Sequence, residues 1–223
     1  MAGQLTSQEI AQKYDLFARW YDFVEGVPDL LGVRKLRGQL LARASGKILE
    51  VAAGTGKNFS FYPKSSELTA VDVSAEMLRA ARRRARRLGL NVKLVLADAE
   101  ALPFSDRSFD AVVSTLTTCT FPNPVAALSE MARVCRTNGR ILLLDHGRSD
   151  RQWLARWQDR RDEPHARQLG CHWNREPLKL VNEAGLKPIR SRRTFFGVFH
   201  LIEAERPNEG SPIRRNAAEA LSQ

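Results

Sequence analysis

Residues 47–59, KILEVAAGTGKNF, join a short apolar run to a turn that contains Gly54 and Gly56. Glycine has no Cβ, so the backbone of such a turn can come into van der Waals contact with a ligand. The next apolar run, LTAVDVS, carries Asp72, whose carboxylate can accept hydrogen bonds from both hydroxyls of a ribose. Together these features predict a site for a nucleoside-bearing ligand at the edge of a parallel sheet.

The same loop indicates which kind of ligand it suits. A dinucleotide-binding loop carries a third glycine three residues after the second, where the helix packs close and presents its N-terminus to a pyrophosphate. Phe59 occupies that position here. Two glycines followed by a bulky residue suit a ligand without phosphates, such as S-adenosyl-L-methionine, although two glycines alone are also typical of an ordinary turn.

The chain beyond this loop alternates apolar runs with helical patterns. The sequence predicts a helix over 75–88, a strand over 92–97 that ends at Asp98 and Ala99, a strand from 109 through AVVST, a helix over 124–135 and a strand RILLLDH over 140–146. This order predicts right-handed βαβ crossovers, and therefore an α/β fold with a parallel sheet and helices on both faces.

Four motifs in this order resemble a known family over nearly the whole chain. EVAAGTG, AVDVS, ADAEALPFSDRSFDAVVS and ALSEMARVCRTNGRILLLD resemble the class I S-adenosylmethionine-dependent methyltransferases, in the branch with the ubiquinone and menaquinone C-methyltransferases. GTGKNFSFYP, TLTTCTFPNP and GCHWNREPLKLVNEAGL resemble the methyltransferase-like 7 group of thiol methyltransferases and their bacterial relatives. The resemblance implies a Rossmann-like fold with a mostly parallel seven-stranded sheet.

The resemblance also implies roles for individual residues in binding S-adenosyl-L-methionine. Glu50 is expected to meet the methionine amino group, Asp72 the ribose, and Asp98 with the Ala99 amide the adenine. The rest of the expected set comprises Ala52, Ala53, Gly54, Thr55 and Gly56 around the methionine and ribose, Ser114, Thr115 and Leu116 beside the sulfonium, and Val73, Met77, Tyr14 and Tyr21. The commonest family pattern has glycine where this chain has Ala52, while ubiquinone-type members carry alanine.

The first residues predict a helix with one apolar face. Ile10, Tyr14, Phe17, Tyr21 and Val24 recur at helical spacing, which is typical of a helix docked on a domain, and the resemblance implies that it also roofs the cofactor. A second amphipathic piece covers residues 30–44. We therefore expect an N-terminal helical lid over residues 1–45, the methyltransferase domain over 46–206 and a loosely ordered tail over 207–223.

Methyl transfer from a sulfonium needs few catalytic side chains, because the alignment of acceptor, methyl group and leaving sulfur supplies much of the acceleration. A general base is needed only when the acceptor arrives protonated, as a thiol or an ammonium does near neutral pH. His172, His146 and Asp145 are the candidates, Asp145 because it follows a strand at the edge where ligands bind. The alternative for each histidine is a structural role, which is the commoner one.

Charge leaves the class of acceptor open. Lysine and arginine number 35 against 25 acidic residues, a net charge of +10, and RAARRRARR lies on the helix after the second strand. Such patches attract anionic lipid or nucleic acid, or are only solvated. Residues 114–119, STLTTC, lack the Asn/Asp-Pro-Pro-aromatic grip of base-methylating enzymes, so nucleic acid is disfavoured.

We therefore expect methyl transfer to a thiol or amine of a small lipophilic or lipid-like acceptor. Phosphatidylethanolamine N-methylation at anionic membranes, quinone C-methylation and, less favoured, RNA methylation are the alternatives. Six aromatic residues in the last third supply apolar area for such an acceptor, although each one alone is more typical of a core: Trp153, Trp157, Trp173, Phe195, Phe196 and Phe199.

The three cysteines, Cys119, Cys135 and Cys171, show no CxxC or zinc-ligand spacing. This pattern predicts a reducing compartment and no metal site. The polar start, MAGQLTSQEIAQK, and the absence of a long apolar run predict a cytoplasmic protein, in contact with anionic membranes at most peripherally. The sequence contains no signal for an oligomeric state.

Overall fold

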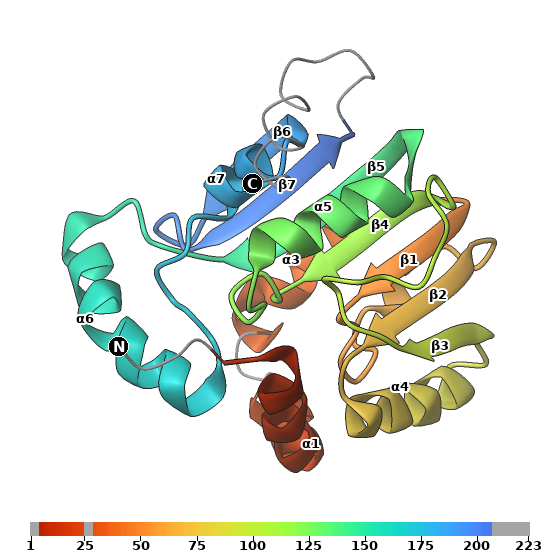
Figure 1. The fold of residues 1–223 in the computed structure, drawn as a ribbon, viewed down its shortest axis with the longest axis horizontal. Helices are drawn as coiled ribbons and strands as arrows, with labels where there is room; N and C mark the ends of the chain where they lie inside the picture. The colour runs from red at the N-terminus through yellow and green to blue at the C-terminus, as the bar shows by residue number, and fades with distance from the viewer. Residues whose placement is uncertain (1–4, 25–28, 207–223) are drawn as a thin grey trace, which may run out of the picture.

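The computed structural model describes residues 5–24 and 29–206, without the side chains of residues 17, 19–24, 30 and 31. One seven-stranded sheet organises these residues, with strand order β3-β2-β1-β4-β5-β7-β6 (Figure 1). The strands are β1 (Lys47–Val51), β2 (Glu67–Asp72), β3 (Val92–Leu96), β4 (Phe109–Thr115), β5 (Cys135–His146), β6 (Lys187–Thr194) and β7 (Phe199–Glu205). Only β7 runs antiparallel to its neighbours β5 and β6, so the expected mostly parallel sheet is confirmed.

Helices cover both faces of the sheet because its central strands are apolar on both sides (Figure 1). On one face α3 (Arg34–Leu41) and α4 (Ala75–Arg87) enclose one hydrophobic cluster with β1 and β2. On the other face α5 (Pro124–Val134) and α7 (Pro177–Glu183) enclose a second cluster. Ser74 and Asn123 begin α4 and α5 by accepting hydrogen bonds from the amides of residues Met77 and Ala126.

The glycine turn that follows β1 is held by the core as well as shaped for a ligand. Ala52, Gly54 and Gly56 adopt φ angles of 53°, 56° and 76°, the left-handed region that favours glycine. A Cβ on Gly56 would lie 2.4 Å from Cε2 of Phe59. Phe59 is 1% exposed and begins the short helix η2 (Phe59–Phe61). The residue that replaces the third glycine therefore fills the space beside the second one.

The N-terminal helix α1 (Ser7–Val24) packs across the carboxyl ends of the strands, between α4 and α6 (Gln152–Leu169) (Figure 1). Asp15 accepts hydrogen bonds from the Ser74 hydroxyl and the Glu76 amide at the start of α4. On the other side, Lys13 Nζ donates to the carbonyls of Arg167 and Gln168 near the end of α6. The helix thus bridges two elements that are far apart in sequence.

Two details differ from the sequence prediction. The amphipathic piece over 30–44 is not one helix, because Gly32 with φ 119° separates η1 (Asp29–Val33) from α3. The helix predicted over 124–135 ends at residue 134, and β5 already begins at Cys135. Residues 137–139, TNG, are typical of a turn. Cys135 pairs with Phe109 while Arg140 pairs with Ala111, so these residues form an irregularity inside a long strand instead. The tail predicted over 207–223 lies outside the described residues.

Candidate functional site

A cavity of about 650 Å³, counted with its open mouth, lies at the carboxyl ends of the parallel strands beneath α1. This is the place where open α/β sheets bind ligands. Its lining combines the strand ends with the lid and the loop after β4: Ser7, Ile10, Tyr14, Ala52, Gly54, Asp72, Val73, Met77, Ala97, Asp98, Ala99, Leu116, Thr117, Thr120, Phe121 and Pro122. We refer to it as the donor cavity.

Many of the predicted cofactor residues line the donor cavity, and the others lie behind it. The lining includes Tyr14, Ala52, Gly54, Asp72, Val73, Met77, Asp98, Ala99 and Leu116. The residues behind it are Glu50, Ala53, Thr55, Gly56, Ser114 and Thr115, and the side chains of Phe17, Tyr21 and Val24 lie outside the described residues. The binding roles of all of them stay predictions.

Asp72 holds the glycine turn in place. One carboxylate oxygen accepts the Gly54 amide at 2.8 Å, and the other accepts the Ser74 amide at 2.9 Å. Burial raises the pKa of Asp72 to about 6, against these backbone hydrogen bonds, which lower it. The sequence predicts that this carboxylate meets a ribose, and in the structure it also anchors the turn.

The charge of the donor cavity favours a cationic ligand over a phosphate. Its lining carries the carboxylates of Asp72 and Asp98, and no lysine or arginine is among the described residues that line it. A pyrophosphate placed there would lack a cationic partner, whereas a sulfonium and an ammonium suit two carboxylates. The residues therefore fit S-adenosyl-L-methionine, in agreement with the missing third glycine.

A buried polar network, which no motif in the sequence indicates, lies behind the glycine turn. Arg37 donates to Asn58 Oδ1 at 2.9 Å and to Thr115 Oγ1 at 2.6 Å, and Asn58 donates to Glu50 Oε1 at 2.8 Å. Burial raises the pKa of Glu50 to about 7, against Asn58, the Tyr62 hydroxyl and Arg37, which lower it. A buried carboxyl group behind the turn is compatible with the predicted role of Glu50 toward an ammonium group.

A second cavity adjoins the donor cavity. It measures about 1040 Å³ with its open mouth, and we call it the acceptor cavity. The two cavities share four lining residues, Ile10, Thr120, Phe121 and Pro122. The rest of its wall comes from the start of the chain, from α6 and from the segment after it: Leu5, Asp162, Glu163, Ala166, Arg167, Gly170, His172 and Arg175.

The three predicted catalytic residues lie in different surroundings. His172 lines the acceptor cavity, and its Nδ1 is 2.8 Å from Asp162 Oδ2. His146 lines neither cavity, and its Nε2 is 3.3 Å from Cys171 Sγ. Asp145 is fully buried, and one of its oxygens accepts the amides of Thr117 and Thr118, so its contacts support the loop after β4. Burial raises the pKa of Asp145.

The six aromatic residues proposed for the acceptor do not line either cavity. Trp153 and Phe196 are 68% and 63% exposed, and Trp157 and Phe195 are 47% and 44% exposed. The expectation that such residues are core or pocket is therefore wrong for these four, which lie on the surface. The sequence contained a sign of this, since the tryptophans alternate with arginines along α6.

Comparisons with known proteins agree with the fold. Residues 49–143 match the family described as "Methyltransferase domain". The chain is 36% identical to a phosphatidylethanolamine N-methyltransferase of Cereibacter sphaeroides over 62% of this chain and 70% of that protein. It is also 36% identical to a demethylmenaquinone methyltransferase of Thermus thermophilus, over 61% of this chain and 62% of that protein.

Among solved structures, geranyl diphosphate C-methyltransferase of Streptomyces coelicolor A3(2), in complex with S-adenosyl-L-homocysteine, has the same fold. The TM-score is 0.62 at 16% identity, covering 81% of this chain and 83% of that one. The chain belongs to the class I S-adenosylmethionine-dependent methyltransferases. The cofactor of this class is S-adenosyl-L-methionine, which the residues of the donor cavity fit. Within the described residues, no helix is long and apolar enough to cross a bilayer.

Proposed function

We propose that this enzyme transfers a methyl group to a thiol or amine of a lipophilic acceptor. The observation that carries the proposal is the shared wall of the donor and acceptor cavities, formed by Ile10, Thr120, Phe121 and Pro122. Because the two cavities adjoin at these residues, an acceptor bound in the second cavity would lie next to a donor bound in the first, which an in-line displacement requires. The resemblance of residues 115–124 and 170–186 to the thiol methyltransferases supports a heteroatom over a ring carbon.

S-adenosyl-L-methionine supplies an electrophilic methyl group when it is bound. The protein contributes by positioning the bound molecules and by excluding water. Asp72 and the Gly54 turn orient the nucleoside end, and Tyr14 and Ile10 of α1 close the donor cavity from above. Phe121 and Pro122 give the boundary between the cavities an apolar surface, which removes water from the path of the methyl group.

His172 is the side chain best placed to take a proton from the acceptor. Its Nδ1 faces the Asp162 carboxylate, which also accepts the amides of Trp173 and Asn174. A carboxylate on one ring nitrogen fixes the tautomer and leaves the other nitrogen for a substrate. His172 lies in the acceptor cavity, within reach of a molecule bound there.

The test is an acceptor assay with S-adenosylmethionine that carries a labelled methyl group. We expect the label in an alkyl thiol or a long-chain amine. His172→Asn should lower kcat about 10²- to 10⁴-fold, which is the usual contribution of a group that transfers a proton, and should leave the affinity for the cofactor unchanged. His165→Asn is the matched control, because the His165 ring packs at a tilt against Trp173 and lines neither cavity. Label found only in a quinol carbon or in RNA contradicts the proposal, and equal kcat values remove His172 from the reaction.

Phosphatidylethanolamine is a second candidate acceptor, favoured by a surface beside the acceptor cavity. Trp153, Arg156, Trp157 and Arg160 are exposed and follow each other at helical spacing along one side of α6. The exposed Phe195 and Phe196 join them, because the Ser149 hydroxyl just before α6 donates to the Phe196 carbonyl. Tryptophan with arginine is typical of protein surfaces that enter the headgroup region of an anionic bilayer. We call these six residues the aromatic–arginine face.

Removing the two tryptophans of this face should weaken vesicle binding. For Trp153→Ala/Trp157→Ala we expect at least a tenfold loss of affinity for vesicles of phosphatidylethanolamine and phosphatidylglycerol, measured by co-sedimentation, because each buried side chain contributes about 1.5–3 kcal/mol. Leu88→Ala/Leu96→Ala is the control, since Leu88 and Leu96 are 43% and 61% exposed elsewhere on the molecule. Equal binding by both double variants would exclude the face as a membrane contact.

A further inference from the structure

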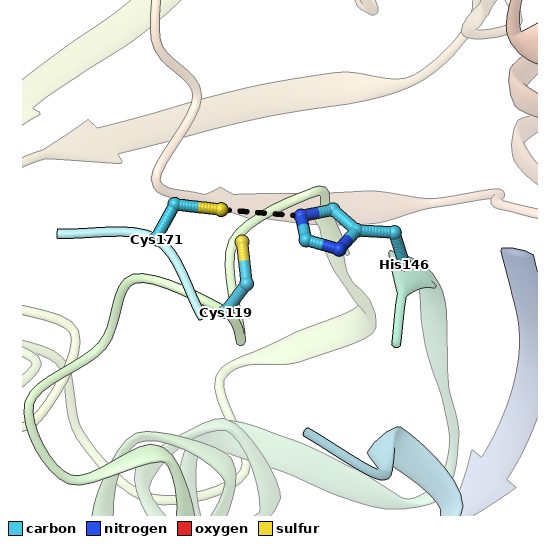
Figure 2. A group of neighbouring side chains, drawn as sticks. All are labelled: Cys119, His146 and Cys171. Carbon is cyan, nitrogen blue, oxygen red and sulfur yellow. Dashed lines mark hydrogen bonds between the residues drawn. The ribbon is translucent and has the colours of Figure 1, made fainter. Parts of the chain in front are cut away.

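Three side chains from separate parts of the chain, Cys119, His146 and Cys171, lie close together (Figure 2). Cys119 comes from the loop after β4, His146 ends β5, and Cys171 follows α6. Cys171 Sγ lies 3.3 Å from His146 Nε2, and the three ligand-type atoms all lie within 4.8 Å of one another. Figure 2 shows both sulfur atoms turned toward the imidazole ring.

The backbone around the three side chains is held from several sides. The His172 amide donates to the Cys119 carbonyl at 2.9 Å, which joins the two cysteine-bearing segments directly. Arg175 donates to the carbonyls of Thr118 and Phe121, on either side of Cys119. Asp145, next to His146, accepts the amides of Thr117 and Thr118. The spacing of the three groups is therefore fixed by contacts that do not involve the thiols themselves.

We propose that Cys119 Sγ, His146 Nε2 and Cys171 Sγ bind one Zn²⁺ ion. Tetrahedral zinc with Zn–S near 2.3 Å and Zn–N near 2.0–2.1 Å sets its ligand atoms about 3.5–3.8 Å apart, so the observed spacing needs only small side-chain movements. Two thiolates and an imidazole are the ligand types that select zinc over magnesium or calcium. Two thiolates also neutralise the charge of the ion, which suits a site whose first cysteine is 2% exposed.

The set leaves a fourth coordination position open. Three protein ligands and one exchangeable position are typical of zinc sites that bind water or substrate, whereas structural sites have four protein ligands. The neighbours of the ligands face the cavities: Thr120 lines both, and Gly170 and His172 line the acceptor cavity. An exogenous thiolate or water at the fourth position would therefore lie beside the acceptor cavity.

Spacing in sequence gave no sign of this site. Cys171 and His146 are 25 residues apart, and each ligand belongs to a different element, so no short motif exists to be recognised. For that reason the sequence predicts no metal site. The tertiary structure brings the three side chains together and thereby indicates one. Two neighbouring thiols also allow a disulfide between Cys119 and Cys171, which the experiment must distinguish from metal binding.

The experiment uses the full chain, reduced and freed of metal with a chelator, and titrated with Zn²⁺ in a calorimeter. We expect one ion per chain and an upward shift of Tm. Cys119→Ser and Cys171→Ser should lower the affinity by more than a hundredfold, beyond the 10- to 100-fold loss that follows removal of an outer-shell partner. Cys135→Ala is the matched control, because Cys135 is a buried cysteine outside the group, and it should bind zinc like the unmodified chain.

Cobalt spectroscopy on the unmodified chain gives an answer that does not depend on how the variants fold. Co²⁺ in the site should show the intense visible absorption of a tetrahedral ion and a thiolate charge-transfer band. Adding 2-mercaptoethanol should shift that band if the fourth position is open. Absence of both bands, or equal zinc affinity of all cysteine variants, overturns the site. So does a Cys119–Cys171 disulfide whose reduction leaves a protein that binds no zinc.

Discussion

Asp72→Asn is expected to weaken the binding of S-adenosyl-L-methionine about a hundredfold, measured by calorimetry at pH 8. The change removes the charge from a group predicted to accept two ribose hydroxyls, and each hydrogen bond to a charged group contributes about 1.5–3 kcal/mol. Asparagine is chosen because its one carbonyl oxygen can still accept either the Gly54 or the Ser74 amide, whereas alanine would leave both without a partner. The effect of the lost hydrogen bond on the fold is measured separately by urea unfolding of the ligand-free variant.

The same carboxylate predicts how binding depends on pH. Because burial raises the pKa of Asp72 to about 6, the affinity of the unmodified enzyme should fall as the pH drops below about 6. The stability of the ligand-free protein should depend on pH in the opposite direction. Its free energy of unfolding decreases as the pH rises from about 4 to about 6, because the native state keeps this proton to a higher pH than the unfolded chain.

Asp110→Asn is the matched control for Asp72→Asn. Asp110 also accepts a backbone amide, that of Lys47, but it lies at the amino end of β4, away from the cavities. We expect this variant to bind the cofactor normally and to show the same pH dependence of binding as the unmodified enzyme. Wild-type affinity in folded Asp72→Asn would show that the carboxylate does not meet the ligand.

Gly56→Ala is expected to destabilise the protein by about 3 kcal/mol, measured by urea unfolding at constant pH. Part of the cost is the left-handed backbone, φ 76°, which costs a residue with a Cβ about 1–2 kcal/mol. The rest comes from the new Cβ, which would lie 2.4 Å from the ring of the buried Phe59, because overpacking in a dense core typically costs 1–3 kcal/mol. The ring cannot move without displacing the core around it.

Gly89 offers a control for the backbone part of this effect. Its φ is 64°, and a Cβ there would have nothing within 4 Å. Gly89→Ala should therefore cost only the conformational part, about 1–2 kcal/mol. The difference between the two variants measures the contact with Phe59. Equal losses for Gly56→Ala and Gly89→Ala would show that the turn tolerates a side chain and that Phe59 does not fix its shape.

Much of the donor cavity could be predicted because its residues sit at fixed offsets from strand ends. Asp72 ends one parallel strand, Gly54 and Asp98 follow two others, and parallel strands end at one edge of the sheet. The acceptor cavity could not be predicted in the same way, since Ile10, Thr120 and His172 come together only when α1 and α6 cross that edge. The sequence of a helix shows which of its faces is apolar, but not which other element that face packs against.

The alternation of apolar runs, the glycine turn and Asp72 determined the fold, the place of the donor cavity and the kind of cofactor, because they act through local spacing and sheet topology. Tertiary structure alone decided three other matters. Arg37 and Asn58 lie behind the turn, and the two tryptophans of α6 lie on the surface. Cys119, His146 and Cys171 lie close together although they are far apart in sequence. The physical reason is that such contacts depend on how separate elements pack, and packing joins residues whose separation in sequence carries no periodic signal.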